Sequence, residues 1–446
     1  MSLKIHVEKF GKIKKADIEL TPFTLFVGDN NSGKSYLLSL IWALQSSEIM
    51  NFLYRDITVL VNSPIYKKLF EIISNSYIEN KELYEKLDTD VFLELLNILL
   101  EKNKKEFVAR IFNHEGIDIE KLAVWTENKK VIIKSTSSVN RLISIYVNGQ
   151  RSKSIGIAEV TDNKKIDTIV KMIINSICSN ILDVKRTNLN EVLYLPSART
   201  GFMLSRTLIN QYGRQNAFDK NFSDNDFLNE EIQPFTKPIL SFLNALDNEQ
   251  IKSKDKFIDL ISFIEIVMTK GCIRKKTAGE KVDYIPSGIS TPLPLRATSA
   301  VVTELSPLLI LLLTSDFIKL ICYEEPEMCL HPQLQQEMGK VLIRLVNLNV
   351  NVVATTHSDI IIQHINNMCI LNSVKENSTI KEKFDLKDED LISENKVAVY
   401  QLTDCGTFAE VDRIYPKNAS FNVPTFTDSL IKILEQTTEI NSLDGE

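Results

Sequence analysis

Phe23-Thr24-Leu25-Phe26-Val27 leads directly into Gly28-Asp29-Asn30-Asn31-Ser32-Gly33-Lys34-Ser35, which fits the pattern G-x-x-x-x-G-K-[ST] of a phosphate-binding loop. The five residues before the loop form a short apolar run, as a buried strand does. Residues 36–44, after the loop, carry apolar side chains at helical spacing. A strand, a glycine-bounded loop and a helix are the context that this motif needs. We therefore prefer a nucleotide site to a chance match in a surface turn.

The residue types in the loop suit a nucleoside triphosphate. The two glycines allow the backbone to curl so that successive N–H groups face an anion, and the helix N-terminus adds partial positive charge. We expect Lys34 to reach the β- and γ-phosphates of ATP and the Ser35 hydroxyl to bind Mg²⁺. The expected contacts to ATP are Gly28, Asp29, Asn30, Asn31, Ser32, Gly33, Lys34, Ser35 and Tyr36.

Composition is that of an ordinary globular chain. With 446 residues it can hold two or three compact units, and its net charge of −6 provides no overall basic field for nucleic acid. Basic clusters such as Arg274-Lys275-Lys276 are interpreted as solvated faces, so nucleic acid stays an open partner without a clear signal. The most apolar run, Leu308–Leu313, is too short to cross a membrane. Six scattered cysteines and the lack of an evident signal peptide predict a cytoplasmic protein.

The pattern of apolar residues predicts an α/β fold, with a mixed sheet, flanking helices and two mainly helical insertions. A helix at 332–348 between buried strands at 317–323 and 350–354 indicates parallel pairing with a crossover. A hairpin is expected at 397–414 and a closing helix at 426–435. The expected segments are an N-terminal lobe with the phosphate loop (1–48), a helical insertion (49–122), a strand hairpin, helix and strand that belong to the same unit as the phosphate loop (123–200), a short helical arm (201–270), a C-terminal lobe (271–437) and a tail (438–446).

Two adjacent carboxylates, Glu324 and Glu325, follow the strand predicted at 317–323. The carboxyl ends of strands in α/β sheets are where ligands bind. A Glu-Glu pair by itself is more commonly an exposed acidic turn, but the phosphate loop in the same chain favours a role in phosphoryl transfer. We expect Glu324 to hold Mg²⁺ and Glu325 to polarise the attacking water.

His357 ends the next predicted strand, one crossover after the two carboxylates. A lone histidine is usually structural. Because parallel strands end at the same edge of a sheet, this histidine is placed to reach a γ-phosphate, and we count it as catalytic together with Lys34 and Glu325.

These motifs together resemble the ABC-type ATPase heads of SMC-like and OLD-like proteins. The chain is most similar to AAA-family ATPases (AAA_15-like and AAA_21-like) of bacterial anti-phage defence systems. The resemblance covers residues 1–48 and about 271–437 and leaves both helical insertions without a motif. It is carried by Phe10-Gly11-Lys12-Ile13-Lys14-Lys15-Ala16, the phosphate loop, Tyr323-Glu324-Glu325-Pro326-Glu327-Met328-Cys329-Leu330-His331-Pro332 and Ala354-Thr355-Thr356-His357-Ser358.

The resemblance implies a homodimer, or a higher oligomer, in which two heads enclose two ATP molecules. The signature serine that meets the partner's γ-phosphate corresponds to Ser299, although the glycine usual after it is Ala300 here. Glu324 stands where most relatives have aspartate. A glutamine of the Q-loop is missing at its expected place, where Arg199 follows a strand end. Arg199 either approaches phosphate or is a surface loop residue.

The favoured function is a Mg²⁺-dependent ATPase that dimerises on ATP and regulates a separate effector, a nuclease or a toxin, in anti-phage defence. The alternative is a DNA-repair or chromosome-maintenance ATPase that acts on DNA directly, which would need a long coiled coil or a basic surface. The ATPase subunit of a transporter fits the sequence less well. A nucleotide-dependent binding module without turnover would leave Glu325 without a role.

Overall fold

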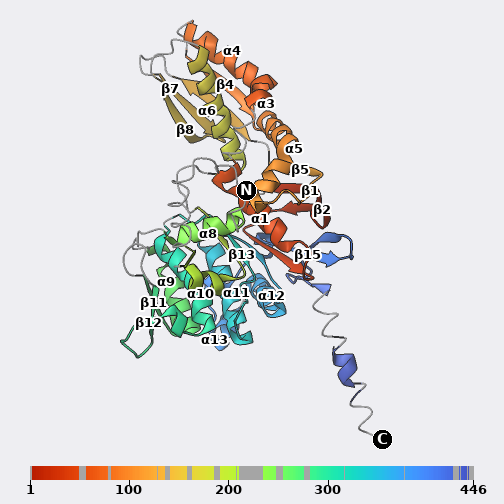
Figure 1. Cartoon of the computed structure of the whole chain (residues 1–446), viewed down its shortest axis with the longest axis vertical. Coiled ribbons are helices and arrows are strands. Elements are labelled where there is room, and N and C mark those ends of the chain that lie inside the picture. Colours follow the sequence, from red (N-terminus) through yellow and green to blue (C-terminus); the bar gives the residue numbers. More distant parts are fainter. Residues whose placement is uncertain are drawn as a thin grey trace, which may run out of the picture.

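A large mixed sheet lies at the centre of the structure, with helices on both faces and a smaller α/β lobe at one end (Figure 1). The sheet has nine strands in the order β5-β1-β2-β16-β15-β3-β14-β13-β9. The α/β class with a mixed sheet and flanking helices is thus confirmed. This computed structural model describes residues 3–49, 57–78, 82–127, 129–135, 141–157, 163–184, 191–206, 208–209, 235–247, 255–275, 282–315, 317–375, 377–424, 431, 433–438 and 440.

The strand that leads into the phosphate loop occupies the middle of this sheet. Strand β3 pairs in parallel with β14 on one side and with β15 on the other. β13 and β9 continue the parallel part, whereas β1 pairs antiparallel with β2 and β5. The strands of this sheet are β1 (Lys4–Phe10), β2 (Ile13–Glu19), β3 (Phe23–Gly28), β5 (Lys121–Trp125), β9 (Val192–Leu195), β13 (Leu320–Glu324), β14 (Asn351–Thr355), β15 (Val397–Asp404) and β16 (Ala409–Ile414).

Successive side chains of β3 enter two separate hydrophobic cores, because strand side chains alternate between the two faces of a sheet. Phe26 belongs to a core shared with α1, and Leu25 and Val27 belong to a core shared with α10, α11 and α12. Both faces of β3 are thus buried, as the apolar run before the loop indicates. The helices are α1 (Lys34–Gln45), α10 (Ala300–Thr314), α11 (Pro332–Asn347) and α12 (Asp359–Ser373).

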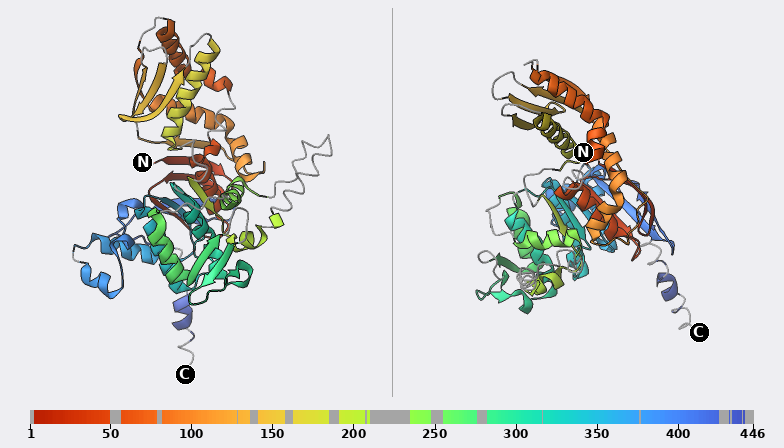
Figure 2. Two further views of the ribbon diagram at one scale, coloured as in Figure 1. Left: turned by 90° about the vertical axis from the view of Figure 1, so that its left-hand side faces the viewer. Right: turned by 45° about the horizontal axis from the view of Figure 1, so that its top comes forward.

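The lobe at the end of the molecule is a four-stranded antiparallel sheet with helices on one face (Figure 2). We call it the second lobe. The long helix α5 (Asp90–Phe112) runs from it to the large sheet, where it packs on β5 (Figure 1). The second lobe consists of α4 (Pro64–Ile78), β4 (Tyr84–Asp88), β6 (Lys130–Ser135), β7 (Arg141–Val147), β8 (Gln150–Ile157) and α6 (Asn163–Ile181).

The described part of residues 49–122 is mainly helical, as expected, and it also contributes β4 to the second lobe and the start of β5 to the large sheet. The hairpin of β7 and β8 does not join the sheet of the phosphate loop, because β6 pairs it with β4 instead. β4 was missed because it has only five residues, three of which are charged, and Leu87 is its one buried side chain.

The helices expected to form an arm lie in a core instead. The structure has α8 (Lys237–Asp247) and α9 (Ile258–Phe263), which continues as a π-helix at Ile264–Thr269. Their side chains Phe242 and Phe257 are buried in the core that contains α10. α8 packs on β9 of the large sheet and on α10, whereas α9 packs on α10 and α11.

The remaining elements are short. The hairpin expected at 397–414 is confirmed as β15 and β16, whereas much of the closing helix expected at 426–435 falls outside the described residues. Across the part of the chain that is described, no helix has both the length and the apolar character needed to cross a membrane. The other elements are α3 (Ile57–Asn62), β10 (Gly271–Lys275), β11 (Val282–Pro286), β12 (Leu293–Pro294) and α13 (Ser378–Lys383).

Candidate active site

The phosphate loop has the backbone conformation that its two glycines allow. Gly28 has φ of 119° and Gly33 has φ of 97°, both in the region that favours glycine. A Cβ at Gly28 would lie 2.0 Å from the carbonyl oxygen of Leu402 in β15, so this position excludes any side chain. Gly33 is also the N-cap of α1, and it supplies no side chain to bond the first N–H groups of that helix. Those N–H groups are the donors that a phosphate would use.

Lys34 is folded back over the loop. Its ammonium donates to the carbonyl oxygens of Gly28 at 3.1 Å and of Asp29 at 2.5 Å, and the side chain is almost fully buried. Burial lowers the pKa of Lys34 to about 8, partly offset by the negative charges of Glu325 and Asp29. A buried cation that is held mainly by neutral carbonyl groups is a favourable place for a polyanion to bind.

The loop is supported from the β15–β16 turn. The backbone N–H of Asp404 donates to the carboxylate of Asp29 at 2.9 Å, and Lys12 donates to the carboxylate of Asp404 at 2.6 Å. The N–H of Asp29 donates to Leu402 at 3.1 Å. Sequence reasoning missed this support, because Asp29 and Asp404 are separated by most of the chain.

Glu324 ends β13, and both of its carboxylate oxygens accept hydrogen bonds. Oε1 accepts from the Tyr194 hydroxyl at 2.8 Å, and Oε2 accepts from the backbone N–H of Ser197 at 2.9 Å. Tyr194 also lies 3.2 Å from the Ser39 hydroxyl on α1. These contacts fix the orientation of the carboxylate expected to hold Mg²⁺, and they come from β9 and the segment after it, where the sequence analysis considered only Arg199.

Glu325 has a left-handed backbone, with φ of 41°. This conformation is uncommon for a residue other than glycine, asparagine or aspartate and is found at functional sites. Its N–H donates to the carbonyl of Thr355 in β14 at 2.9 Å. Burial and the nearby charge of Glu324 raise the pKa of the Glu325 carboxyl, while Lys34 and Arg199 lower it. A raised pKa brings a carboxylate closer to the value that suits a general base at neutral pH.

His357 lies beside Glu325, as the parallel strands predict. Its Nε2 is 4.0 Å from Oε1 of Glu325, and its backbone N–H donates to the Glu327 carboxylate at 2.6 Å. Burial and the nearby Lys34 lower the pKa of His357, so the ring is neutral at pH 7. Glu327 also accepts from the Thr356 hydroxyl at 3.0 Å and thereby ties β14 to the segment after β13. The role of Glu327 was not foreseen.

Arg199 corrects both interpretations from the sequence. Its guanidinium is fully buried, so it is not a surface residue, and its donors are directed at the protein instead of at the phosphate loop. It donates to the carbonyl oxygens of Glu324 at 2.5 Å and Glu325 at 2.9 Å and forms an ion pair with Glu304 of α10 at 2.6 Å. The lone carboxylate of Glu304 within the apolar run of α10 was the signal that could have indicated such a partner.

The other predicted residues lie at the start of two helices. Ser35 is exposed on the first turn of α1, and the Tyr36 ring packs on Phe112 with centroids 4.9 Å apart. Ser299 is the exposed N-cap of α10, where its hydroxyl accepts from the N–H of Val302. The N-terminus of α10 therefore faces solvent, and α10 is joined to the two glutamates through the ion pair of Glu304.

The Glu324 carboxylate and the Ser35 hydroxyl, the two protein ligands expected from the sequence, are of a type that suits Mg²⁺. A serine hydroxyl and one carboxylate, completed by phosphate oxygens and water, is a set that Mg²⁺ accepts, because this ion usually keeps several waters. Each oxygen of Glu324 accepts one protein hydrogen bond and keeps a further lone pair. Among the described residues, no group of three or more histidine, cysteine or acidic side chains forms a separate metal site.

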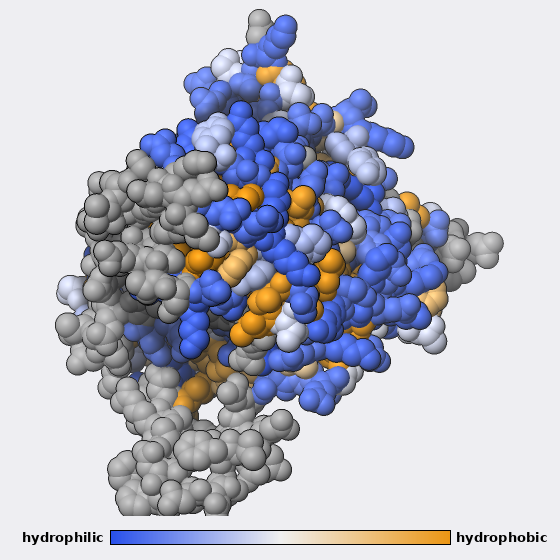
Figure 3. Space-filling model, turned by 90° about the horizontal axis from the view of Figure 1, so that it is seen from above, coloured by the Kyte–Doolittle hydropathy of each residue, from blue (hydrophilic) through white to orange (hydrophobic). Residues whose placement is uncertain are grey.

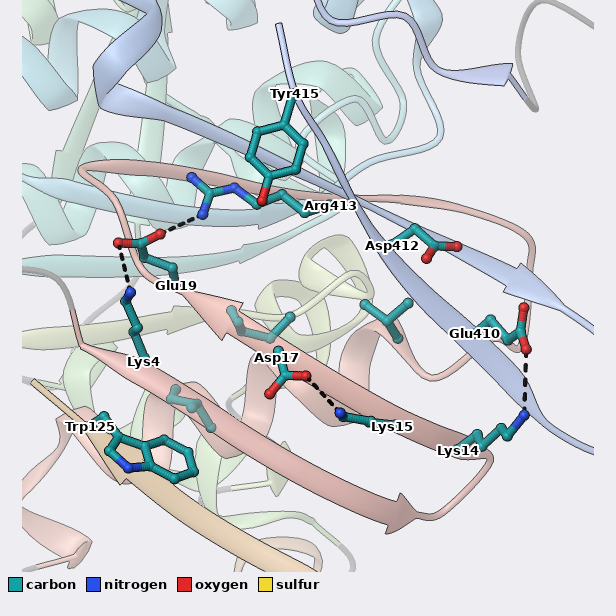
Figure 4. A pocket seen from close by; sticks show the side chains of 13 residues that line it. Lys4, Lys14, Lys15, Asp17, Glu19, Trp125, Glu410, Asp412, Arg413 and Tyr415 are labelled. Carbon is teal, nitrogen blue, oxygen red and sulfur yellow. Dashed lines mark hydrogen bonds and ion pairs between the residues drawn. The ribbon is translucent and has the colours of Figure 1, made fainter.

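A hollow of about 700 Å³ lies on the surface of the large sheet, away from these residues (Figure 4). It extends over β1, β2 and β16, with Trp125 and Tyr415 at its edges. Each of the four cationic side chains in the hollow pairs with a carboxylate, so every positive charge there is already balanced. The pairs are Lys4 with Glu19 at 3.8 Å, Lys14 with Glu410 at 3.6 Å, Lys15 with Asp17 at 3.3 Å, and Arg413 with Glu19.

Residues 1–362 match the AAA_15 family, whose description is AAA ATPase domain. The chain belongs to this family. In this AAA_15 chain the match includes the phosphate loop, Glu324, Glu325 and His357, and it ends before β15. The chain is therefore an ATPase of AAA type, and the β15 strand that supports its phosphate loop lies outside the matched region.

No curated protein matches the sequence. Three solved structures of SMC heads are similar to this AAA_15 chain. A SmcHead bound to the C-winged helix domain of ScpA is 11% identical over 93% of this chain and 98% of its own, with a TM-score of 0.38. An SMC head domain from Thermotoga maritima is 12% identical over 93% of this chain and 100% of its own, with a TM-score of 0.32. A Smc head from Pyrococcus furiosus with an extended coiled coil, bound to the C-terminal domain of ScpA, is 11% identical over 98% of this chain and 98% of its own, with a TM-score of 0.35.

Proposed function

We propose that this chain hydrolyses ATP with Mg²⁺ and that Glu325 is the general base. Lys34 binds the β- and γ-phosphates, Ser35 and Glu324 hold Mg²⁺, and His357 contacts the γ-phosphate. The observation that carries the proposal is the position of Glu325, which is held in a left-handed conformation with its carboxylate 4.0 Å from His357. Bound Mg²⁺ would stabilise charge on the phosphates.

In this proposal, different groups bind the phosphates and transfer the proton. The N–H groups at the start of α1 and the ammonium of Lys34 bind the phosphates, and the Glu325 carboxylate takes a proton from the attacking water. The neutral His357 ring can donate one hydrogen bond to a phosphate oxygen. The raised pKa of Glu325 favours this proton transfer at neutral pH.

We further propose that two chains dimerise on ATP, so that Ser299 of one contacts the γ-phosphate bound by the other. The exposed position of Ser299 at the N-terminus of α10 supports this arrangement, because N-terminal N–H groups of a helix attract phosphate. Ala300 is exposed as well and its methyl group is small, so it allows a close approach.

The biological role that we propose is regulation of a separate effector, a nuclease or a toxin, in bacterial anti-phage defence. It is supported by the resemblance of the sequence motifs to such ATPases. The second candidate, a chromosome-maintenance ATPase that acts on DNA, needs a surface for nucleic acid.

The variant Glu325→Gln tests the catalytic part. It should bind ATP with nearly unchanged affinity and hydrolyse it at least about a hundredfold more slowly, since general bases typically contribute about 10²- to 10⁴-fold. Fluorescent-nucleotide binding and phosphate release under single-turnover conditions measure the two properties. Glu410→Gln, on the exposed side of β16, is the matched control and should behave like the wild type. Turnover of Glu325→Gln at the wild-type rate would show that another residue is the base.

A further inference from the structure

The four-stranded sheet of the second lobe has one covered face and one open face. On the covered face, Leu87, Val131 and Ile145 are buried in the core that includes α6. Glu85 points to the same side, because it forms an ion pair with Lys68 of α4 at 2.8 Å. Since side chains alternate along a strand, the residues between these positions point away from the helices.

The open face is strongly basic. Four cationic side chains stand on it against a single carboxylate, that of Asp88, which pairs with Lys130 at 2.7 Å. The register confirms that they share one face, because Tyr84 is opposite Lys134, Ile132 is opposite Tyr146, and Tyr146 is opposite Arg151. The open face consists of Tyr84, Lys86, Asp88, Lys130, Ile132, Lys134, Leu142, Ser144, Tyr146, Arg151 and Ser154.

Two tyrosine rings lie among these cations. Tyr84 is 54% exposed, and the ammonium of Lys86 lies 5.6 Å from its ring centroid. The ammonium of Lys134 lies 5.3 Å from the Tyr84 ring and 5.4 Å from the Tyr146 ring, so it stands between the two. Arg151 is fixed on the same face, because it donates to the Ser154 hydroxyl at 2.7 Å. The exposed ring of Tyr84 and the partly buried ring of Tyr146 therefore alternate with cations across neighbouring strands.

We propose that this open face binds single-stranded nucleic acid. Bases stack on the rings of Tyr84 and Tyr146, and the phosphates between them pair with Lys86, Lys134 and Arg151. Aromatic side chains on a sheet face offer a stacking surface to any base, and cations beside them follow the backbone. In a chain with a net charge of −6, a basic and aromatic face of this kind is a local exception.

Other partners fit the face less well. An acidic protein segment would use the cations but leaves the two rings without planar partners. The bases of a duplex are already stacked on one another, so they do not need the tyrosines. An apolar partner would bury Lys86, Lys134 and Arg151 without compensation, which is costly. The end of the molecule that carries the second lobe is also mainly hydrophilic, with hydrophobic residues in small groups (Figure 3).

The proposal does not depend on ATP hydrolysis, and it is tested without nucleotide. Fluorescence anisotropy with the full chain measures binding of labelled single strands of about 20 nucleotides, poly-dT and poly-U in separate arms, against a duplex of equal length. Single strands of at least one type should bind more tightly than the duplex. The two arms show whether the sugar matters.

The variant Tyr84→Ala/Tyr146→Ala should weaken binding about tenfold or more, because stacking on each ring is lost. Tyr84→Phe/Tyr146→Phe keeps both rings and should bind like the wild type. Lys86→Gln/Lys134→Gln should lower the slope of log affinity against log salt by about 0.7 for each lost phosphate contact. Tyr415→Ala, an exposed tyrosine on the far side of the large sheet, is the matched control and should leave binding unchanged.

Three results would overturn the proposal. The first is that neither single strand binds at about 50 mM salt, where phosphate contacts are strong. The second is equal binding by the tyrosine-to-alanine variant when circular dichroism shows it to be folded. The third is polyglutamate binding as tightly as the oligonucleotides, which would make the face a general site for acidic proteins. None of these results depends on whether the chain hydrolyses ATP.

Discussion

The Arg199 guanidinium is fully buried, yet it reaches three separate segments of the chain. It binds the carbonyl oxygens of Glu324 and Glu325, donates to Pro196 at 2.8 Å, and pairs with Glu304 of α10. Its guanidinium also lies 4.7 Å from the centre of the Tyr323 ring. We infer that Arg199 is a positioning residue, because it holds the backbone of Glu325 in its left-handed conformation.

Arg199→Met should destabilise the fold by about 3–5 kcal/mol, since it leaves the Glu304 carboxylate buried without its partner. The double variant Arg199→Met/Glu304→Met should recover part of this loss, because no charge remains unpaired. Both variants should hydrolyse ATP more slowly than the wild type, since nothing holds the carbonyl of Glu325. Urea unfolding measures the free energy of unfolding, and kcat is measured with ATP binding as a separate readout.

A double variant as stable as the single variant would mean that the two residues do not act as a pair. A folded double variant with wild-type kcat would contradict the positioning role of Arg199. Lys340→Met removes a largely buried charge on α11, away from the site, and is the matched control.

The residues of the phosphate loop could be predicted because their chemistry is local. Gly28, Gly33 and Lys34 stand within one short motif, and its spacing alone implies the geometry. The partners of Arg199 could not be predicted, because Glu304 is more than a hundred residues away and only the packing of α10 brings it near. Likewise, Tyr194 contacts Glu324 only because β9 pairs with β13.

Helices α11 and α12 meet around a histidine that plays no part in the site. His364 on α12 is almost fully buried, and a Cβ at Gly339 of α11 would lie 2.7 Å from its ring. Burial, together with the nearby cation of Lys340, lowers the pKa of His364 to about 4, although Asp390 acts in the opposite direction. The interface between the two helices therefore tolerates only the neutral ring.

This interface should lose stability in mild acid. The unfolded histidine takes up a proton below its ordinary pKa of about 6.5, whereas the folded ring stays neutral until pH approaches about 4, so protons favour the unfolded state between these values. Between about pH 7 and pH 5 the contribution of His364 to the free energy of unfolding should fall by about 2 kcal/mol. Chemical unfolding at both pH values measures it against His364→Phe, which keeps a ring but cannot titrate. An equal pH dependence in both proteins would contradict the assignment.

At the scale of whole elements, those with a strong period were predicted and those with weak patterns were not. α11 and β14 have long or wholly apolar patterns, and they lie close to their expected places. β13 begins at Leu320, three residues later than expected, because Phe317 is 68% exposed. β4 was missed because a short strand with a single buried side chain has almost no signature.

Ser299 is exposed at the N-terminus of α10. The proposed dimer would place it against the phosphate loop of a second chain. With Glu325→Gln and ATP, the mass of the purified protein in solution should rise to twice that of one chain, and without ATP it should fall back. Expression together with neighbouring genes shows in the same measurement whether an effector assembles with it. Ser299→Arg should prevent the ATP-dependent increase, whereas Arg296→Ala, on the exposed turn before α10, is the control. A mass that does not respond to ATP would contradict the dimer.

The central place of β3 in the sheet also has a consequence for the synthesis of the chain. Both strands that flank β3, β14 and β15, come from residues after 350, and every residue of β3 is buried once they are in place. A ribosome that has just made β3 must add roughly 320 more residues before β14 begins and roughly 370 before β15 begins, which takes on the order of tens of seconds at about 5–20 residues per second. During that time an apolar strand with two unpaired edges is exposed and is a natural client for a chaperone. The phosphate loop is thus translated long before the strands that complete its surroundings.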